Sequence, residues 1–248
     1  MANKFLGIGC LAGFFSGLLG IGGGLVMIPL LTFWGGFSQK EAYGTSLVAI
    51  IFAGIFGSVA YHFHGTLDVI AAVIIASAAM GSSFLGVRYC NRQPEWKLKR
   101  FFGFFLILSV ALLLSKPYFT SLVPSAGFSR VLLLVFIGTL GGFLSGLLGV
   151  GSGGIMVAGM VVFAGMEQVS AQGTALLVMV PTGIVGAYAH WRRGNVRTEG
   201  IVRVILGILC GSVLGASVAH AVSVSVLLFC FCAVLLVMAC KYLATKKQ

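Results

Sequence analysis

Two glycine clusters, each accompanied by hydroxyl side chains, have the residue types and spacing to bind a small anion. The clusters occupy residues 20–24 and 149–154, and each interrupts a long apolar run. Glycines allow successive backbone N–H groups to point into one concavity, and a helix that starts after the turn adds partial positive charge there. We therefore predict an anion-binding site built from these turns and nearby neutral groups. Its candidate residues are Ser16, Gly20, Gly22, Gly23, Gly24, Thr45, Ser145, Gly149, Gly151, Ser152, Gly153, Gln172 and Thr174.

The candidate side chains are neutral donors, which suit a weakly basic oxyanion that must bind and also leave. Ser16 and Ser145 precede the two turns, Ser152 lies within the second turn, and Thr45 and Thr174 lie at the starts of the following helices. An alternative stays open for each hydroxyl, because Ser and Thr in apolar helices also bond to the preceding helical turn or to a neighbouring helix.

The acidic residues argue against a cation pathway. All five lie in or next to the loops of the predicted fold: Glu41, Asp68, Glu95, Glu167 and Glu199. Carriers of sodium ions or protons usually need a carboxylate deep in the membrane as a ligand or relay. Any coupled proton would therefore have to use a histidine, a loop acid or the protonated substrate.

The composition excludes a soluble globular enzyme. Hydrophobic residues make up 59% of the 248 residues and charged residues only 8%, against about 25% charge in soluble domains. The net charge of +11 falls between apolar segments, which predicts charges that set membrane topology and no nucleic-acid partner. The cysteines and histidines have no zinc-like or haem-like spacing, so no metal or other cofactor is predicted. A redox role stays open for Cys230 and Cys232.

The chain is internally duplicated. Residues 12–67 align without gaps onto residues 141–196, and 21 of the 56 aligned pairs are identical. We predict two repeats, residues 1–115 and 131–248, joined by an extracytoplasmic linker at 116–130. In each half a glycine-interrupted apolar run precedes three uninterrupted runs. The eight runs are Phe5–Gly36, Ala42–Tyr61, Val69–Val87, Leu98–Ser115, Val131–Gly165, Ala171–Ala189, Ile201–Ala219 and Val224–Cys240.

The distribution of Lys and Arg favours a re-entrant hairpin in each interrupted run, because cytoplasmic loops carry the excess of basic residues. Eight plain crossings place ten basic residues inside and six outside. Two hairpins with three crossings per half place fourteen inside and only Lys116 and Arg130 outside. Three crossings per half also invert the second repeat, so the two turns enter from opposite faces and meet near the midplane. The predicted fold is an all-α polytopic membrane protein with two inverted-topology repeats and cytoplasmic termini.

The pattern resembles the signature of the sulfite exporter TauE/SafE family of membrane permeases. The resemblance implies a multi-pass plasma-membrane carrier, not an enzyme, for sulfite, organosulfonates or related sulfur anions. The second half departs from the pattern at Ser152, opposite Gly23, and at Ala158, opposite Pro29. The resembling segments are residues 16–24 with Pro29, their second-half counterparts, Gly44–Ser46, Gly81–Gly86 and the basic central loop.

We therefore expect a secondary transporter that moves a small sulfur-containing anion by alternating exposure of a midplane site. Its expected partners are that anion and the lipid bilayer of the cell membrane, and a homo-oligomer stays open. An anion channel of the same architecture is the first alternative, since the same turns could line a pore. A thiol-dependent membrane redox protein is the second alternative.

Overall fold

The computed structural model of the chain describes residues 2–19, 23–63, 67–115, 128–151, 153–219 and 224–244, and its regular structure there is α-helical throughout. The all-α class predicted from the sequence is thus confirmed. The ten helices of the described residues are α1 (Ala2–Leu19), α2 (Gly24–Phe33), α3 (Gln39–Phe63), α4 (Val69–Arg92), α5 (Glu95–Ser115), α6 (Phe128–Leu148), α7 (Gly153–Val162), α8 (Gln168–Trp191), α9 (Ile201–Ala219) and α10 (Val224–Leu243).

Several helices have the length and hydropathy of membrane spans, as expected for a polytopic membrane protein. Within the described residues, four segments are long and apolar enough to cross a bilayer: Gln39–Phe63, Val69–Arg92, Ser129–Leu148 and Val169–Trp191. By contrast, α2 and α7 have 10 residues each, whereas a full span takes about 20 residues. These two helices are therefore too short to cross a bilayer, and the predicted total of eight segments stays a prediction.

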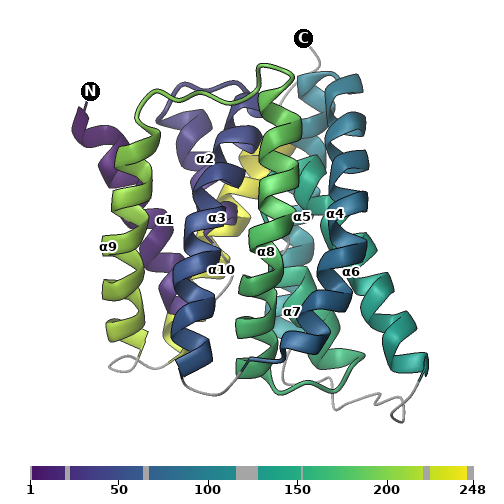
Figure 1. Cartoon of the computed structure of the whole chain (residues 1–248). Helices are drawn as coiled ribbons and strands as arrows, with labels where there is room; N and C mark the ends of the chain where they lie inside the picture. The colour runs from purple at the N-terminus through teal and green to yellow at the C-terminus, as the bar shows by residue number, and fades with distance from the viewer. Residues whose placement is uncertain are drawn as a thin grey trace.

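The first glycine-interrupted run contains two antiparallel helices. Gly23, immediately before α2, lies against Ala12 in α1. Phe37, which follows α2, returns to Phe5 near the start of α1, with 5.9 Å between the ring centroids. The chain thus descends along α1 and returns along α2 (Figure 1).

The second interrupted run folds in the same way. Gly141 in α6 lies against Met156 in α7, and Ile137, one turn earlier in α6, lies against Gly159, later in α7. The two contacts run in opposite order along the chain, so α6 and α7 are antiparallel. Each glycine cluster therefore separates the two arms of a helical hairpin.

The helices of the two halves of the chain pack against one another. α1 packs against α9, α6 packs against α4, and α3 packs against α8. Glycines allow the close approach in the first two pairs, since Gly13 lies against the backbone of Ile208 and Gly142 against the backbone of Ala79. Small residues at helix contacts are typical of membrane proteins, in which van der Waals packing drives association.

The two ends of the helix bundle carry different parts of the chain. α1 begins and α10 ends at the same end, where the connection between α8 and α9 also lies, as Figure 1 shows at the top. α3 begins at this end, whereas α8 begins at the opposite end. The start of α6 also lies at that opposite end.

We expect leucine at Gly13 or Gly142 to destabilise the fold, because the new side chain would meet a neighbouring helix backbone. Overpacking of this kind costs about 1–3 kcal/mol. The matched controls are Gly7→Leu in α1 and Gly81→Leu in α4, where an added Cβ has open space. Thermal unfolding of the purified protein in detergent should show lower midpoints for the first two variants only. Equal midpoints for all four would contradict the packing described above.

Candidate functional site

The glycine turns of the two halves touch each other. Gly24, the first residue of α2, lies so close to Val150 that an added Cβ would overlap the Val150 carbonyl group. Val150 lies between Gly149 and Gly151, whose φ angles are 67° and 79°, in the left-handed region that favours glycine. Gly23 is also left-handed, with a φ of 66°. The sequence thus places glycine where the backbone turns and where the two turns approach.

The second turn is held in place by α3. The Ser46 hydroxyl lies 2.6 Å from the Gly149 carbonyl oxygen and 2.9 Å from the Tyr43 carbonyl oxygen, and it can donate its proton to either. The Gly149 N–H donates to the Ser145 carbonyl at 2.8 Å. Ser46 was not among the predicted site residues, although it belongs to the Gly44–Ser46 segment. The repeat offered no signal for it, because Ala175 is its second-half counterpart.

Two buried serines lie beside the turns. Ser16 is 8% exposed and its Cβ faces Gly23 across a close contact. Ser145 is 1% exposed, and its hydroxyl has no hydrogen-bond partner within the described part of the chain. A buried hydroxyl normally has a partner. Ser145 is therefore equipped to bond to a molecule that enters the site.

The start of α2 adds backbone donors to the same region. Gly23 is the N-cap and no side chain caps the helix there. The Gly23 carbonyl accepts from the N–H groups of Val26 and Met27 at 3.2 and 3.0 Å, whereas the first N–H groups of any α-helix lack an acceptor within the helix. Because Gly24 and Leu25 are buried, these donors lie out of bulk water, and the helix dipole there favours negative charge.

Three other predicted residues lie away from the turns and already have partners. The Thr45 hydroxyl oxygen accepts from the Arg197 N–H at 3.1 Å, and the Thr174 hydroxyl oxygen accepts from the Asp68 N–H at 3.2 Å. Gln172 Oε1 accepts from the Tyr61 hydroxyl at 3.1 Å.

The remaining predicted residues divide in two. Gly153 is the first residue of α7 and is buried. Gly20, Gly22 and Ser152 lie outside the described residues.

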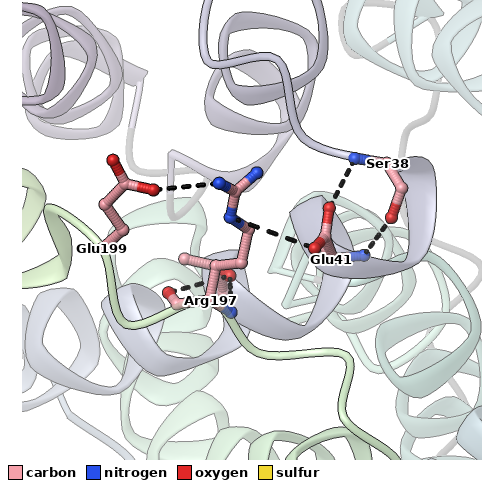
Figure 2. Close-up of polar contacts among 5 residues, drawn as sticks. Ser38, Glu41, Arg197 and Glu199 are labelled. Atoms are coloured by element: carbon pink, nitrogen blue, oxygen red, sulfur yellow. Dashed lines mark hydrogen bonds and ion pairs between the residues drawn. The ribbon is translucent and has the colours of Figure 1, made fainter. Parts of the chain in front are cut away.

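The charged side chains gather at the ends of the bundle. At the end with the chain termini, Arg197 pairs with Glu199 at 2.9 Å and with Glu41 at 4.0 Å (Figure 2). At the opposite end, Arg130 pairs with Asp68 at 3.4 Å. The acids of the described chain occur at helix starts or in connections, as predicted, and none lies beside the glycine turns.

A polar cavity of about 140 Å³ lies apart from the turns, where α2 ends and α3 begins. Gln39 in its wall is fully buried; its Nε2 donates to the Tyr43 hydroxyl at 3.1 Å, and its Oε1 has no hydrogen-bond partner among the described residues. Sequence patterns did not point to this cavity because four helices and a connection supply its walls. The lining residues are Thr32, Phe33, Phe37, Ser38, Gln39, Glu95, Lys99 and Tyr242.

No group of three potential metal-ligating side chains occurs in the described part of the chain. Five cysteines there have free thiols: Cys10, Cys90, Cys210, Cys232 and Cys240. The side chain of Cys230, the other member of the proposed redox pair, lies outside the described residues. The glycine turns therefore carry the ligand-binding argument.

Comparison with known proteins agrees with the helical hairpins and the apolar spans. The family model described as Sulfite exporter TauE/SafE matches residues 5–242. The probable membrane transporter protein YdhB of Bacillus subtilis (strain 168) is 27% identical over 209 residues, which cover 83% of this chain and 85% of the relative. The probable membrane transporter protein YunE of the same strain is 26% identical over 264 residues, covering 94% of each chain.

A third relative, a probable membrane transporter protein of Xylella fastidiosa (strain Temecula1), is 29% identical over 226 residues, covering 89% of this chain and 85% of the relative. No solved structure matches the chain. The family match spans nearly all of the described helices, including both glycine turns. The chain belongs to the sulfite exporter TauE/SafE family of membrane transporter proteins.

Proposed function

We propose that the protein is a secondary transporter that carries a small oxyanion, of the sulfite or organosulfonate class, through a site between the two glycine turns. The substrate class rests on family membership and on the neutral donors beside the turns. The site comprises Ser16, Gly23 and Gly24 from the first half and Ser145 with Gly149–Gly151 from the second.

The contact between Gly24 and Val150, beside the unpartnered Ser145 hydroxyl, is the observation that carries this proposal. Backbone N–H groups and hydroxyls can bind an oxyanion without a fixed positive charge, so binding need not be too tight for release. A fully charged partner such as Arg would strengthen the interaction by a charge-assisted hydrogen bond. Neutral donors are therefore the better chemistry for a transported anion.

The proposed architecture is a pair of inverted repeats. α2, α3 and α5 begin at residues 24, 39 and 95, and α7, α8 and α10 begin 129 residues later, at 153, 168 and 224. The first hairpin has its open end beside the chain termini and the second has its open end at the opposite face (Figure 1). Inverted-repeat transporters place substrate near the midplane, at the interface between the repeats, which is where the two turns touch here.

The proposed orientation puts the termini in the cytoplasm of a cell whose plasma membrane holds the protein. Arg130 lies at the end opposite the termini, paired with Asp68. All other basic residues of the described chain lie at or near the end with the termini, in keeping with the positive-inside rule. They are Lys4, Lys40, Arg88, Arg92, Lys97, Lys99, Arg100, Arg192, Arg193, Arg197, Arg203 and Lys241.

The burial of the turns favours a carrier over a channel. Gly24, Ser145, Val150, Gly151 and Gly153 are all buried. A conducting pore needs a continuous path for the ion, whereas a carrier passes through a conformation closed to both sides. The structure has the features expected of such a closed conformation.

The proposed activity is tested by counterflow in proteoliposomes of the purified protein. We expect saturable exchange of at least one of sulfite, sulfate, thiosulfate and a short sulfonate when that anion is preloaded inside. Conductive flux without saturation or counterflow would instead favour the channel. No flux of any of the four anions, in protein shown to be folded, would contradict the proposed substrate class.

The inverted topology is tested by labelling single cysteines introduced at Lys40, at the start of α3, and at Glu167, just before α8. Arg92→Cys, at the end of α4, is the control for the terminal face. In a cysteine-free background and intact cells, an impermeant thiol reagent should label the Glu167 position and leave the other two unlabelled until the membrane is opened. Labelling of Lys40 and Glu167 from the same side would contradict the inversion.

We expect Ser145→Ala to weaken anion transport while leaving the fold intact, because the lost hydroxyl has no partner within the described protein. A hydrogen bond to a charged group contributes about 1.5–3 kcal/mol, so the apparent affinity should fall about tenfold or more. The control is Ser58→Ala, a buried serine that bonds only within its own helix, to Ile55. Unchanged affinity in Ser145→Ala for every transported anion would remove this hydroxyl from the site.

A further inference from the structure

Two Gly-Thr pairs occupy equivalent places at opposite ends of the bundle. Thr45 near the start of α3 accepts a hydrogen bond from the Arg197 N–H at 3.1 Å, and Thr174 near the start of α8 accepts one from the Asp68 N–H at 3.2 Å. Both members of the second bond lie 129 residues from the members of the first. The same bond is therefore made twice, with the two halves of the chain exchanging roles.

The glycine before each threonine allows this bond to form. An added Cβ at Gly44 would overlap the Asn195 carbonyl and lie 3.0 Å from the His190 Cβ. An added Cβ at Gly173 would lie 2.9 Å from the Tyr61 Cβ. His190 and Tyr61 are again separated by 129 residues. In both places glycine admits the end of a helix from the other half, and this approach brings the threonine within reach of the following connection.

Each connection is also held by an ion pair. At the terminal end, the Arg197 side chain pairs with Glu41, whose Oε2 accepts from the Ser38 N–H at 2.8 Å while the Glu41 N–H donates to the Ser38 hydroxyl (Figure 2). This reciprocal arrangement is a capping box that fixes the start of α3. The carboxylate that anchors Arg197 is therefore itself fixed to a helix end.

The opposite end uses the same device with the charges reversed. Asp68 caps α4 by accepting from the Ala71 N–H at 2.9 Å, and it pairs with Arg130 at the start of α6. One helix-capping carboxylate and one arginine thus reinforce each threonine bond. All four charged side chains are between 29% and 42% exposed, so water screens both ion pairs and each can break and re-form.

We propose that Thr45 with Arg197, and Thr174 with Asp68, are two equivalent latches that close the opposite mouths of the transporter and must open one at a time. This inference rests on the proposed transport by alternating access, since such a carrier needs one closure at each face. Both latches are formed in the structure, and the glycine turns between them are buried. The two threonines therefore act as positioning residues for transport, separate from the groups that touch the anion.

The latches are tested with Thr45→Val and Thr174→Val, which keep the side-chain shape and remove the acceptor. The reporters are Ala42→Cys in α3 and Ala171→Cys in α8, two fully buried positions one turn before each threonine. Each reporter is introduced alone into a cysteine-free protein in nanodiscs, where both faces are accessible, and its rate of alkylation is measured.

We expect Thr45→Val to raise alkylation at position 42 about fivefold or more and to leave alkylation at position 171 unchanged or lower. Thr174→Val should have the mirror-image effect. Thr45→Ser and Thr174→Ser keep the hydroxyl and should react as the parent protein does. A rise at both reporters in either valine variant would indicate general loosening and overturn the proposal, as would no change at either reporter.

The accessibility measurement does not depend on the substrate, so it separates this inference from the proposed function. If the valine variants open opposite ends while no anion is transported, the latches stand and the proposed substrate class fails. If anion counterflow is saturable while both valine variants leave both reporters unchanged, the transport proposal stands and the latches fail. When both hold, each valine variant should also lower the counterflow rate.

Discussion

The glycine turns are governed by one constraint, which is that backbone polar groups inside a membrane protein must be satisfied by the protein or by what it binds. An ordinary helix satisfies its own groups, but α2 and α7 start within the bundle. At the second turn, Ser46 supports the Gly149 carbonyl and Ser145 supports the Gly149 N–H. The start of α2 has no side-chain cap, so a bound anion would complete what the protein leaves unfinished.

Close backbone approach is the second condition on which the fold depends. Hydrocarbon chains compete with apolar side chains for contact, so helices in a bilayer associate through tight packing. Glycines permit that packing along α1 and α9, along α6 and α4, and between the two turns. The same residue type therefore serves helix association and the shape of the candidate site.

The polar contacts at the ends of the bundle differ in kind from the packing inside it. The interior is held by two large clusters of buried apolar side chains, whereas the ends are joined by single hydrogen bonds and half-exposed ion pairs. A molecule built in this way can loosen one end at modest cost and keep its interior packed. That division of strength suits the proposed transport, in which the two ends open alternately around a buried site.

The amino-acid sequence by itself determined the all-α membrane class, the family and the duplication, because hydropathy and repeated motifs are properties of the chain read in order. It also indicated where the helical runs are interrupted, since glycine clusters are visible without coordinates. Only the tertiary structure brought Gly24 to Val150, assigned Ser46 to the second turn and gave the Thr45 and Thr174 hydroxyls partners in the other half of the chain. These contacts join residues more than 100 positions apart, and helix periodicity carries no information about which distant helices pack together.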